Sequence, residues 1–448
     1  MNNRILITGT HSGCGKTTVV CALLAALKNR GLRLSAFKCG PDYIDPMFHR
    51  RAVGVPSHNL DPFFCTSEQL KEKITAYGGE ISLLEGAMGY YDGVGPKGCY
   101  SAYDVARNTQ TPVVLVVDVR GMYASVGAVL KGFSSYKPGH GIRGVIFNNA
   151  SPMLYEGLSS LARQSGLTPL GFLPREGQVT IESRHLGLVT ANEIAGLDEK
   201  LTLLGALAER YIDLDTLLAL AANAPALDTS PPSIRPLGSA RLAVARDEAF
   251  CFLYEENLTL LRALGCEILF FSPLRDQSLP AGAAGLYLCG GYPELYLKAL
   301  SANKPMLEAI GTAIQAGMPA IAECGGFLYL HRMLDTACLA GVIPATAYKA
   351  EKLNRFGYVT LRAQRDNLLC AAGESIRAHE FHYYESTDCG DGFIAEKPLS
   401  IRSWPCVHAT ETLYAGFPHL YLEANPAVAK NFVKKVVRYA AASSAQTD

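Results

Sequence analysis

The chain of 448 residues lacks long hydrophobic runs and carries no excess of charge of either sign. No apolar stretch approaches the roughly 18 residues that suggest a membrane-spanning helix. Lys plus Arg number 41, as do Asp plus Glu, so the formal net charge is zero and a nucleic-acid partner is not expected. The first residues, Met-Asn-Asn-Arg-Ile-Leu-Ile-Thr-Gly, enter a strand-like run at once rather than a targeting segment. We therefore expect a soluble cytoplasmic protein with no nucleic-acid or membrane partner.

Paired cysteine motifs are also absent. The 13 cysteines are scattered singly and without CxxC spacing, which argues against a disulfide scaffold or a zinc ribbon. No convincing short repeat occurs, and the length favours two domains. The segment 226–239 is rich in Pro and Ser, which break helices and strands. We predict domains at 1–225 and 240–448, joined by a linker at 226–239.

Short apolar runs alternate with helical patterns on both sides of this linker, which is typical of parallel α/β sheets. Strand-like runs before the linker are 5–8, 34–38, 81–85, 112–118 and 144–148, with a first helix at 16–28. Those after it are 241–245, 268–271, 285–288 and 319–322, with helices near 249–264 and 304–316. The tail after Val436 is rich in Ala and Ser and is expected to fray.

A glycine-rich segment, Gly9-Thr-His-Ser-Gly-Cys-Gly-Lys-Thr17, joins the first strand to the first helix. Backbone amides in such a turn cradle phosphates, the lysine neutralises phosphate oxygens and the threonine hydroxyl can bind Mg²⁺. The spacing departs from the usual GxxxxGK[ST], because Thr10 occupies the first glycine position. The residues predicted to bind the nucleotide are Gly13, Gly15, Lys16, Thr17 and Thr18.

Carboxylates at strand ends near this segment predict the rest of an Mg²⁺ site. Glu85 ends an apolar run, and a carboxylate there can hold the ion directly or through water. Asp42 and Asp45 are further candidates, but prolines flank them, and turn residues are the alternative. Lys38, at another strand end, is predicted to bind phosphate or a substrate carboxylate, with a solvated surface lysine as the alternative.

Cys324 differs from the other cysteines because it lies between an apolar run and two glycines. This order is typical of a nucleophile on a sharp strand-to-helix turn. The amide of Gly325 could then face the oxygen of a tetrahedral intermediate, with a second donor from the pair ending at Gly291. An ordinary loop is the alternative for that glycine pair. A thiolate nucleophile needs a base, and His419, which opens an apolar run, is our candidate.

The remaining histidines near this site receive other roles. His331 follows Cys324 by seven residues on the same predicted helix and is expected at the surface. His379 and His382 bracket Glu380 at a spacing of three, whereas metalloproteases place their two histidines four apart on a helix. We favour substrate contact over metal ligation for this motif.

Together these motifs resemble the cobyrinate a,c-diamide synthase family, which has relatives that act on hydrogenobyrinate and nickel-sirohydrochlorin. The stretches that carry the resemblance are 9–17, 37–46, 85–93, 184–188, 245–250, 290–294, 322–327 and 379–382. The resemblance implies an N-terminal domain similar to dethiobiotin synthetase and a C-terminal domain similar to class I glutamine amidotransferases. It further implies that Mg²⁺, ATP, glutamine and a tetrapyrrole polycarboxylate bind, and that the chain forms a homodimer.

The resemblance also implies the chemistry. ATP would phosphorylate a peripheral carboxylate of the macrocycle, and ammonia from glutamine would displace phosphate, once at each of the a and c side chains. Class I amidotransferases usually carry Glu two residues after the histidine, where this chain has Tyr421, so the third member of the site is unassigned. Asn149 stands where many relatives have arginine. By resemblance, Cys324 forms a glutamyl thioester with His419 as base, Asn148 contacts the adenine, and the metal residues are Thr17, Asp45 or Asp42, and Glu85.

Three alternatives stay open on the sequence. The same chemistry on hydrogenobyrinate or nickel-sirohydrochlorin is the first, because these macrocycles present similar carboxylates. Cobyric acid synthase amidates four other side chains with similar domains, although the stretches 40–46 and 323–327 favour the a,c-diamide enzyme. A P-loop ATPase of the partitioning type would explain residues 9–17 but nothing after residue 240.

Overall fold

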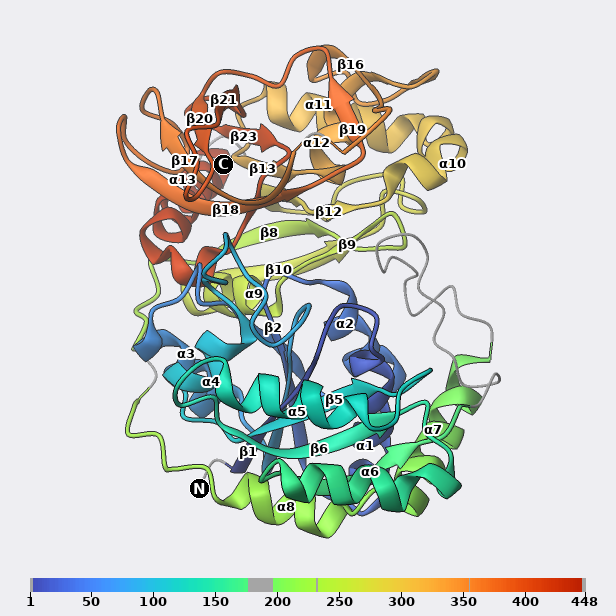
Figure 1. Ribbon diagram of the computed structural model, residues 1–448. Helices are drawn as coiled ribbons and strands as arrows, with labels where there is room; N and C mark the ends of the chain where they lie inside the picture. The colour runs from blue at the N-terminus through green and yellow to red at the C-terminus, as the bar shows by residue number, and fades with distance from the viewer. Residues whose placement is uncertain (1–2, 176–195, 231–232, 354, 445–448) are drawn as a thin grey trace. The chain divides into compact units, whose positions relative to one another are not determined.

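The computed structural model describes residues 3–175, 196–230, 233–353 and 355–444. The chain divides into two compact units, Met1–Pro232 and Ser233–Asp448, which are coloured blue to green and yellow-green to red in Figure 1. The division falls inside the segment 226–239, while the exact domain limits stay a prediction. The stretch 184–188 lies outside the described residues. Among the helices of the described ranges, none has the length and apolar character needed to cross a membrane.

The first unit is built on a seven-stranded parallel sheet with the order β3-β2-β4-β1-β5-β6-β7. Its strands are β1 (Asn3–Gly9), β2 (Leu34–Cys39), β3 (Ser57–Leu60), β4 (Ile81–Glu85), β5 (Val113–Asp118), β6 (Ile142–Asn148) and β7 (Thr168–Leu173). Every residue of β5 is buried, as its run of valines predicts for a strand covered on both faces. Because the strands are parallel, β1, β2, β4 and β6 bring their carboxyl ends to one edge of the sheet.

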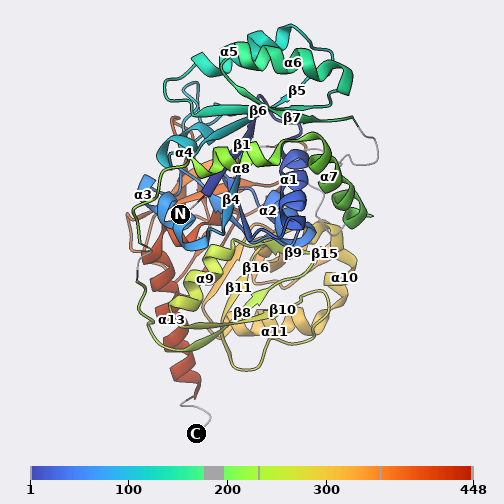
Figure 2. The same ribbon diagram turned by 90° about the horizontal axis from the view of Figure 1, so that it is seen from below.

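Helices cover both faces of this sheet. They are α1 (Lys16–Asn29), α2 (Ile44–Met47), η1 (Phe48–Ala52), α3 (Ser67–Tyr77), α4 (Ala102–Asn108), α5 (Ser125–Ser135), α6 (Pro152–Gln164), α7 (Leu197–Tyr211) and α8 (Leu214–Ala222). Figure 2 shows α5 and α6 on one side of β5, β6 and β7, and α1, α7 and α8 on the other. Helix α1 packs between the sheet and α7, which together bury its apolar residues. Its first turn lies at the sheet edge.

The second unit contains a six-stranded sheet with the order β10-β8-β11-β13-β23-β22, which is parallel except for the last pair. Its strands are β8 (Ala240–Ala245), β10 (Cys266–Phe271), β11 (Ala283–Leu288), β13 (Ala320–Glu323), β22 (His408–Ala409) and β23 (Leu413–Gly416). A short antiparallel pair, β9 (Phe250–Phe252) and β12 (Gly290–Gly291), extends beyond the carboxyl end of β11.

Two smaller sheets complete this unit. The antiparallel sheet β21-β20-β17-β18-β24 and the mixed sheet β15-β14-β16-β19 both come from the last third of the chain. Their strands are β14 (His331–Leu334), β15 (Ala337–Cys338), β16 (Ile343–Lys349), β17 (Phe356–Ala363), β18 (Ser375–Phe381), β19 (Tyr384–Ser386), β20 (Phe393–Glu396), β21 (Ser403–Cys406) and β24 (His419–Leu420). The helices are α9 (Glu255–Ala263), η3 (Pro293–Tyr296), α10 (Leu297–Ala302), α11 (Lys304–Gln315), α12 (Gly325–Leu330), η4 (Leu422–Ala424) and α13 (Pro426–Ser444).

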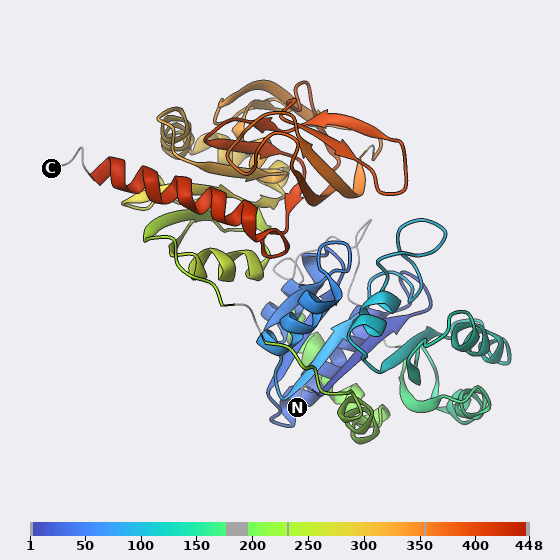
Figure 3. The same cartoon turned by 90° about the vertical axis from the view of Figure 1, so that its left-hand side faces the viewer.

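The α/β class predicted for both halves is confirmed, with two local corrections. The run 249–264 is not one helix, because Phe250–Phe252 forms β9 and the helix begins at Glu255. The tail after Val436 does not fray up to Ser444, since α13 continues to that residue. Figure 3 shows α13 as a long red helix, and its buried apolar side packs against β8 and β11, which stabilises it.

Candidate active sites

In the first unit, residues 10–15 form the turn between β1 and α1. Gly13 and Gly15 adopt left-handed backbone conformations with φ of 81° and 93°. A Cβ on Gly15 would lie 2.0 Å from Asn148 Nδ2, so the turn closes against the end of β6 only because residue 15 is glycine. Asn148 Nδ2 donates a hydrogen bond to the carbonyl of Cys14 at 3.0 Å and thereby braces the turn. This geometry leaves the start of α1 able to bind an anion.

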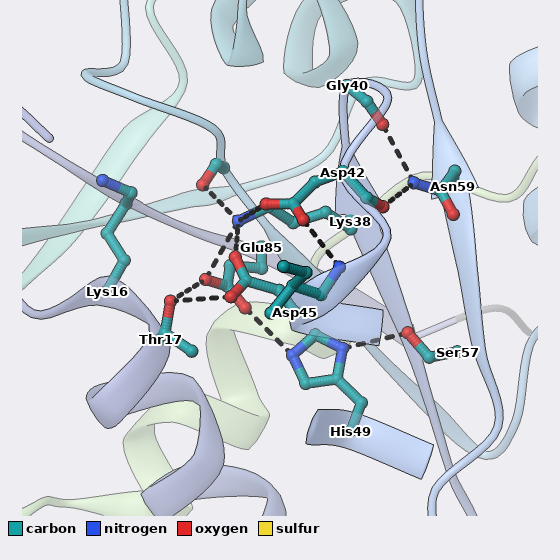
Figure 4. Close-up of polar contacts among 12 residues, drawn as sticks. Lys16, Thr17, Lys38, Gly40, Asp42, Asp45, His49, Ser57, Asn59 and Glu85 are labelled. Carbon is teal, nitrogen blue, oxygen red and sulfur yellow. Dashed lines mark hydrogen bonds and ion pairs between the residues drawn. The ribbon is translucent and has the colours of Figure 1, made fainter. Parts of the chain in front are cut away.

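Lys16 and Thr17 are the first two residues of α1, and Thr18 follows them in the same turn. The Lys16 ammonium is buried and donates to the carbonyl of His11 at 3.1 Å. Burial lowers the pKa of Lys16 from its ordinary value. Figure 4 shows its amino group apart from that of Lys38. A phosphate would offer Lys16 a counterion that the His11 carbonyl does not.

Beside this turn, four side chains converge in what we term the lysine–carboxylate cluster: Thr17, Lys38, Asp45 and Glu85 (Figure 4). Thr17 Oγ1 donates to Glu85 Oε1 at 2.8 Å and to Asp45 Oδ1 at 3.3 Å. Lys38 Nζ donates to Asp45 Oδ2, and to Glu85 Oε1 at 3.1 Å. Asp45 and Glu85, which follow Thr17 by 28 and 68 positions in the sequence, thus meet at its hydroxyl.

In the lysine–carboxylate cluster one ammonium faces two carboxyl groups, the buried Glu85 and the partly buried Asp45. Burial alone would lower the pKa of Lys38, but Asp45 and Glu85 outweigh it and raise that pKa well above its ordinary value. Burial and then the Glu85 carboxylate raise the pKa of Asp45. For Glu85, burial acts upward, but Lys38 and hydrogen bonds from His49 and Thr17 hold its pKa well below the usual range. A bound cation would therefore favour the ionised form of Asp45, which burial and Glu85 disfavour.

The sequence left two roles open for Asp42, metal ligand and turn residue, and the structure shows it as a turn residue. Its Oδ1 accepts a hydrogen bond from the amide of Ile44 at 2.8 Å, two residues on. Its other oxygen lies 3.9 Å from Lys38 Nζ, whereas the Asp45 carboxylate lies closer to that nitrogen. Lys38 itself is buried, so the surface alternative for it is wrong. Asp45 rather than Asp42 is the carboxylate that joins Glu85 and Thr17.

His49 is a member of the site that sequence reasoning missed. Its ring is fully buried, with Nε2 at 2.9 Å from Glu85 Oε2 and Nδ1 at 2.9 Å from Ser57 Oγ. The histidine thus fixes the second oxygen of Glu85 while Thr17 and Lys38 contact the first. The only sequence signal was its place four residues after Asp45, on the short η1 segment.

The lysine–carboxylate cluster offers a hydroxyl and carboxylate oxygens, which are the donors that Mg²⁺ prefers. No group of three or more His, Cys, Asp or Glu with metal-binding geometry occurs in the described part of the chain. Mg²⁺ does not require one, because it retains several waters and takes further ligands from substrate phosphates. Thr17, Asp45 and Glu85 therefore fit this ion, and their role as its ligands stays a prediction.

In the second unit, Cys324 joins β13 to α12 with φ of 47° and ψ of −101°. Left-handed φ is costly for a non-glycine residue and here marks a turn of the nucleophile-elbow type. The Cys324 amide donates to the carbonyl of Gly416 at 2.8 Å, which anchors the turn to β23. Burial raises the pKa of its thiol, and the Glu294 carboxyl adds to the rise. Cys324 thus needs a base before it can attack.

Gly325 and Gly291 come together beside Cys324. The Gly291 backbone nitrogen lies 2.9 Å from the position that a Cβ on Gly325 would take. A Cβ on Gly291 would lie 2.1 Å from the carbonyl oxygen of Ala249, so β12 approaches β9 too closely for a side chain. The predicted oxyanion donors are therefore neighbours, and the glycine pair 290–291 is a short strand rather than an ordinary loop.

His419 reaches the same site from β24. A Cβ on Gly290 would lie 2.4 Å from the Cε1 atom of His419, so the imidazole packs directly against the backbone of β12. The ring of His379 stacks on that of His419, with centroids 4.9 Å apart and an interplanar angle of 18°. Burial, followed by the neighbouring rings of His379 and His382, lowers the pKa of His419 well below its ordinary value. A neutral imidazole is the form that can accept a proton from the thiol.

The His379–His382 motif covers the end of β18, which borders this site, and His382 directly follows the strand. His379 pairs with His419 in the register of β18 and β24, and Cys324 Sγ is 3.9 Å from the carbonyl oxygen of Phe381. The ring of His382 stacks on Phe417, with centroids 3.8 Å apart. The assignment of this motif to substrate contact stays a prediction.

His331 was expected at the surface, and that expectation is wrong. Helix α12 ends at Leu330, so His331 opens β14 and is fully buried. Its ring is held by Ser386 Oγ at 2.7 Å and the Phe327 carbonyl at 2.9 Å. Burial lowers its pKa to about 4. Its contacts lie within the fold, and it is not part of the thiol site.

Comparison with known proteins identifies a family for each unit. Residues 5–189 match the CobQ/CobB/MinD/ParA nucleotide binding domain, and residues 241–399 match the CobB/CobQ-like glutamine amidotransferase domain. Proteins named cobyrinate a,c-diamide synthase from Dehalococcoides mccartyi (strain CBDB1) and Caldanaerobacter subterraneus subsp. tengcongensis are each 36% identical to this chain, over 96% of it and 97% of the relative. That of Thermoplasma acidophilum is 37% identical, over 96% of this chain and 99% of the relative. With both domains matched and relatives aligned over almost their whole length, the chain belongs to the cobyrinate a,c-diamide synthase family.

Proposed function

We propose that the chain amidates the a and c carboxylates of cobyrinate in cobalamin biosynthesis, using ATP and glutamine. The observation that carries the proposal is the left-handed backbone of Cys324 at the end of β13. A partitioning-type ATPase has no use for a thiol held on such a turn, whereas glutamine hydrolysis requires one. The relatives named above support cobyrinate as the substrate.

The first unit would activate the carboxylate. A carboxylate oxygen of the macrocycle attacks the γ-phosphorus of ATP, the bond to the β–γ bridging oxygen breaks, and ADP leaves with an acyl phosphate formed. The turn amides and Lys16 would neutralise the phosphate oxygens, and Asn148 would face the base. Thr17, Asp45 and Glu85 would hold Mg²⁺, which supplies positive charge to the transferring phosphoryl group when bound. Activation is needed because a carboxylate alone is a poor electrophile.

The second unit would supply ammonia. His419 takes the proton of the Cys324 thiol, and the thiolate attacks the side-chain amide carbon of glutamine. The amides of Gly325 and Gly291 would stabilise the oxyanion, and ammonia leaves with the proton from His419. Water then hydrolyses the thioester to glutamate. Ammonia attacks the acyl phosphate, the bond to the phosphate oxygen breaks, and the amide forms with loss of phosphate and a proton.

The test incubates the protein with ATP, Mg²⁺ and glutamine and, in separate reactions, cobyrinate, hydrogenobyrinate or nickel-sirohydrochlorin, and then counts amides by mass. Two amides on cobyrinate are expected. A further reaction contains cobyrinate already amidated at a and c, and a gain of four amides there would instead identify a cobyric acid synthase. ATP hydrolysis without glutamine hydrolysis would favour the partitioning ATPase.

A lysine variant separates the two half-reactions. Lys16→Met should form no amide from either glutamine or ammonium salts, while some glutaminase activity remains. Lys131→Met, which removes an exposed lysine of α5, is the matched control and should behave as wild type. Amide formation by Lys16→Met at the wild-type rate would contradict the assignment of the nucleotide site.

A further inference from the structure

Tyr421 occupies the position where class I amidotransferases usually place the carboxylate that supports the histidine. Its ring packs edge-on against Tyr254, with centroids 4.7 Å apart, and its hydroxyl donates to Glu423 at 3.5 Å. A phenol in these contacts does not supply a carboxylate to His419. The support for this histidine therefore has to come from elsewhere in the fold.

Glu323 brings a carboxyl group to the imidazole from a different strand. It is the last residue of β13, directly before Cys324, and it is 1% exposed. Its Oε2 lies 3.8 Å from Nδ1 of His419. The end of β13 thus supplies both the nucleophile and a carboxyl group. Alternate residues of a strand point to opposite faces, and the turn at Cys324 redirects the chain, so both groups can face one site.

Two neutral donors hold this carboxyl group in place. Its Oε1 accepts a hydrogen bond from the amide of Leu420 at 3.1 Å, and its Oε2 accepts one from the Tyr287 hydroxyl at 3.2 Å. Asn257 in turn donates to the Tyr287 hydroxyl at 3.4 Å and to the Leu420 carbonyl at 2.9 Å. The amide that binds Oε1 belongs to the residue after His419, so Glu323 also fixes the backbone that carries the imidazole.

We propose that Glu323 is a positioning residue for His419 and takes the place of the carboxylate missing at position 421. From 3.8 Å away its charge would favour a proton on Nδ1, which leaves Nε2 to accept the proton of the thiol. When His419 becomes an imidazolium, the nearby carboxylate offsets its charge in a site with little solvent. The inference rests on the glutaminase half of the proposed function.

The titration of Glu323 makes this role measurable. Burial raises its pKa to about 8, although the Leu420 amide and the Tyr287 hydroxyl act in the opposite direction. The carboxylate therefore forms as the pH rises through about 8, and glutaminase kcat should rise with it. The titratable groups that face or neighbour Glu323 from the surrounding elements are Tyr287, Cys289, Cys324, Tyr414 and His419.

The test compares Glu323→Gln with wild type for glutaminase kcat, KM for glutamine and the pH profile. The amide side chain retains an acceptor for Leu420 but no charge. We expect kcat to fall on the order of 10²-fold, with KM changed by less than about threefold, because only the proton transfer is impaired. The rising limb near pH 8 should disappear. Amidation driven by ammonium salts should be unchanged.

Two further variants control for folding. Tyr287→Phe removes a hydrogen bond from the same carboxyl group but keeps the charge, and it should stay within about threefold of wild type. Glu323→Asp keeps the charge but withdraws it by one methylene, and its kcat should lie between those of wild type and Glu323→Gln. A kcat and pH profile equal to wild type in Glu323→Gln would overturn the inference. Wild-type protein without glutaminase activity would instead refute the proposed function.

Discussion

Among the single residues, Cys324 is assigned as the nucleophile. Its backbone adopts a left-handed conformation that an ordinary buried cysteine does not need. Cys324→Ala should lower glutamine-dependent amidation on the order of 10⁴-fold or more while amidation from ammonium salts continues. The reason is that alanine keeps the turn but removes the nucleophile. Measuring both nitrogen sources on the same preparation checks this.

The control for that experiment is the exposed thiol of Cys338, which lies on the short strand β15. Cys338→Ala should match wild type with either nitrogen source. It also removes the exposed cysteine, which reduces alkylation away from Cys324 when a thiol reagent is used. Equal loss of both activities in Cys324→Ala would show that the two sites are not separable.

His49 is the residue through which the Mg²⁺ assignment can be tested without touching a proposed ligand. His49→Ala removes the contact to Glu85 Oε2, so the carboxylate loses its fixed orientation. We expect the Mg²⁺ concentration for half-maximal ATP-dependent activity to rise about 10- to 100-fold, as for other groups that orient metal ligands. A magnesium titration of the amidation rate measures it.

His49→Gln provides the conservative comparison, because its amide can still donate to the Glu85 carboxylate. It should recover part of the Mg²⁺ response that His49→Ala loses. An unchanged magnesium titration in His49→Ala would remove the proposed positioning role of this histidine.

At the scale of elements, the turn before α1 depends on the absence of a side chain at Gly15. Gly15→Ala should weaken ATP binding on the order of 10²-fold, because a Cβ would lie 2.0 Å from Asn148 Nδ2 and displace the turn. Gly31 is a matched control, since it has a φ of 81° but open space around its Cβ position.

Gly31→Ala should cost about 1 to 2 kcal/mol of stability for its left-handed backbone and leave ATP binding intact. Calorimetric ATP binding together with thermal unfolding distinguishes the two variants. ATP affinity equal to wild type in Gly15→Ala would contradict the phosphate-binding role of this turn.

The parallel strands were predictable because their side chains are buried on both faces and their sequences are mostly apolar. The run 113–118 and the run 81–85 are such segments, and each lies where it was expected. The sheets formed by 331–420 gave no comparable signal, since strands such as Ser403–Cys406 are short and partly exposed. Their pairing depends on contacts far apart in sequence, which one-dimensional patterns do not specify.

The candidate sites divide in the same way. Lys16, Thr17 and Cys324 belong to local motifs, so the residues next to them in the sequence indicate their roles. His49 and Glu323 become visible only when strands and helices bring them to Glu85 and His419. Glu323 did carry a signal that went unused, because it is an acidic residue at the end of an apolar strand, as Glu85 is.

At the scale of the whole molecule, the central claim is that one chain joins nucleotide-dependent activation to glutamine hydrolysis. The most direct measurement supplies wild-type protein with cobyrinate, ATP, Mg²⁺ and glutamine labelled with heavy nitrogen at the side-chain amide. The account predicts a product with labelled amides at both the a and the c positions, formed only when ATP is present. A product without label, or amides formed without ATP, would contradict it.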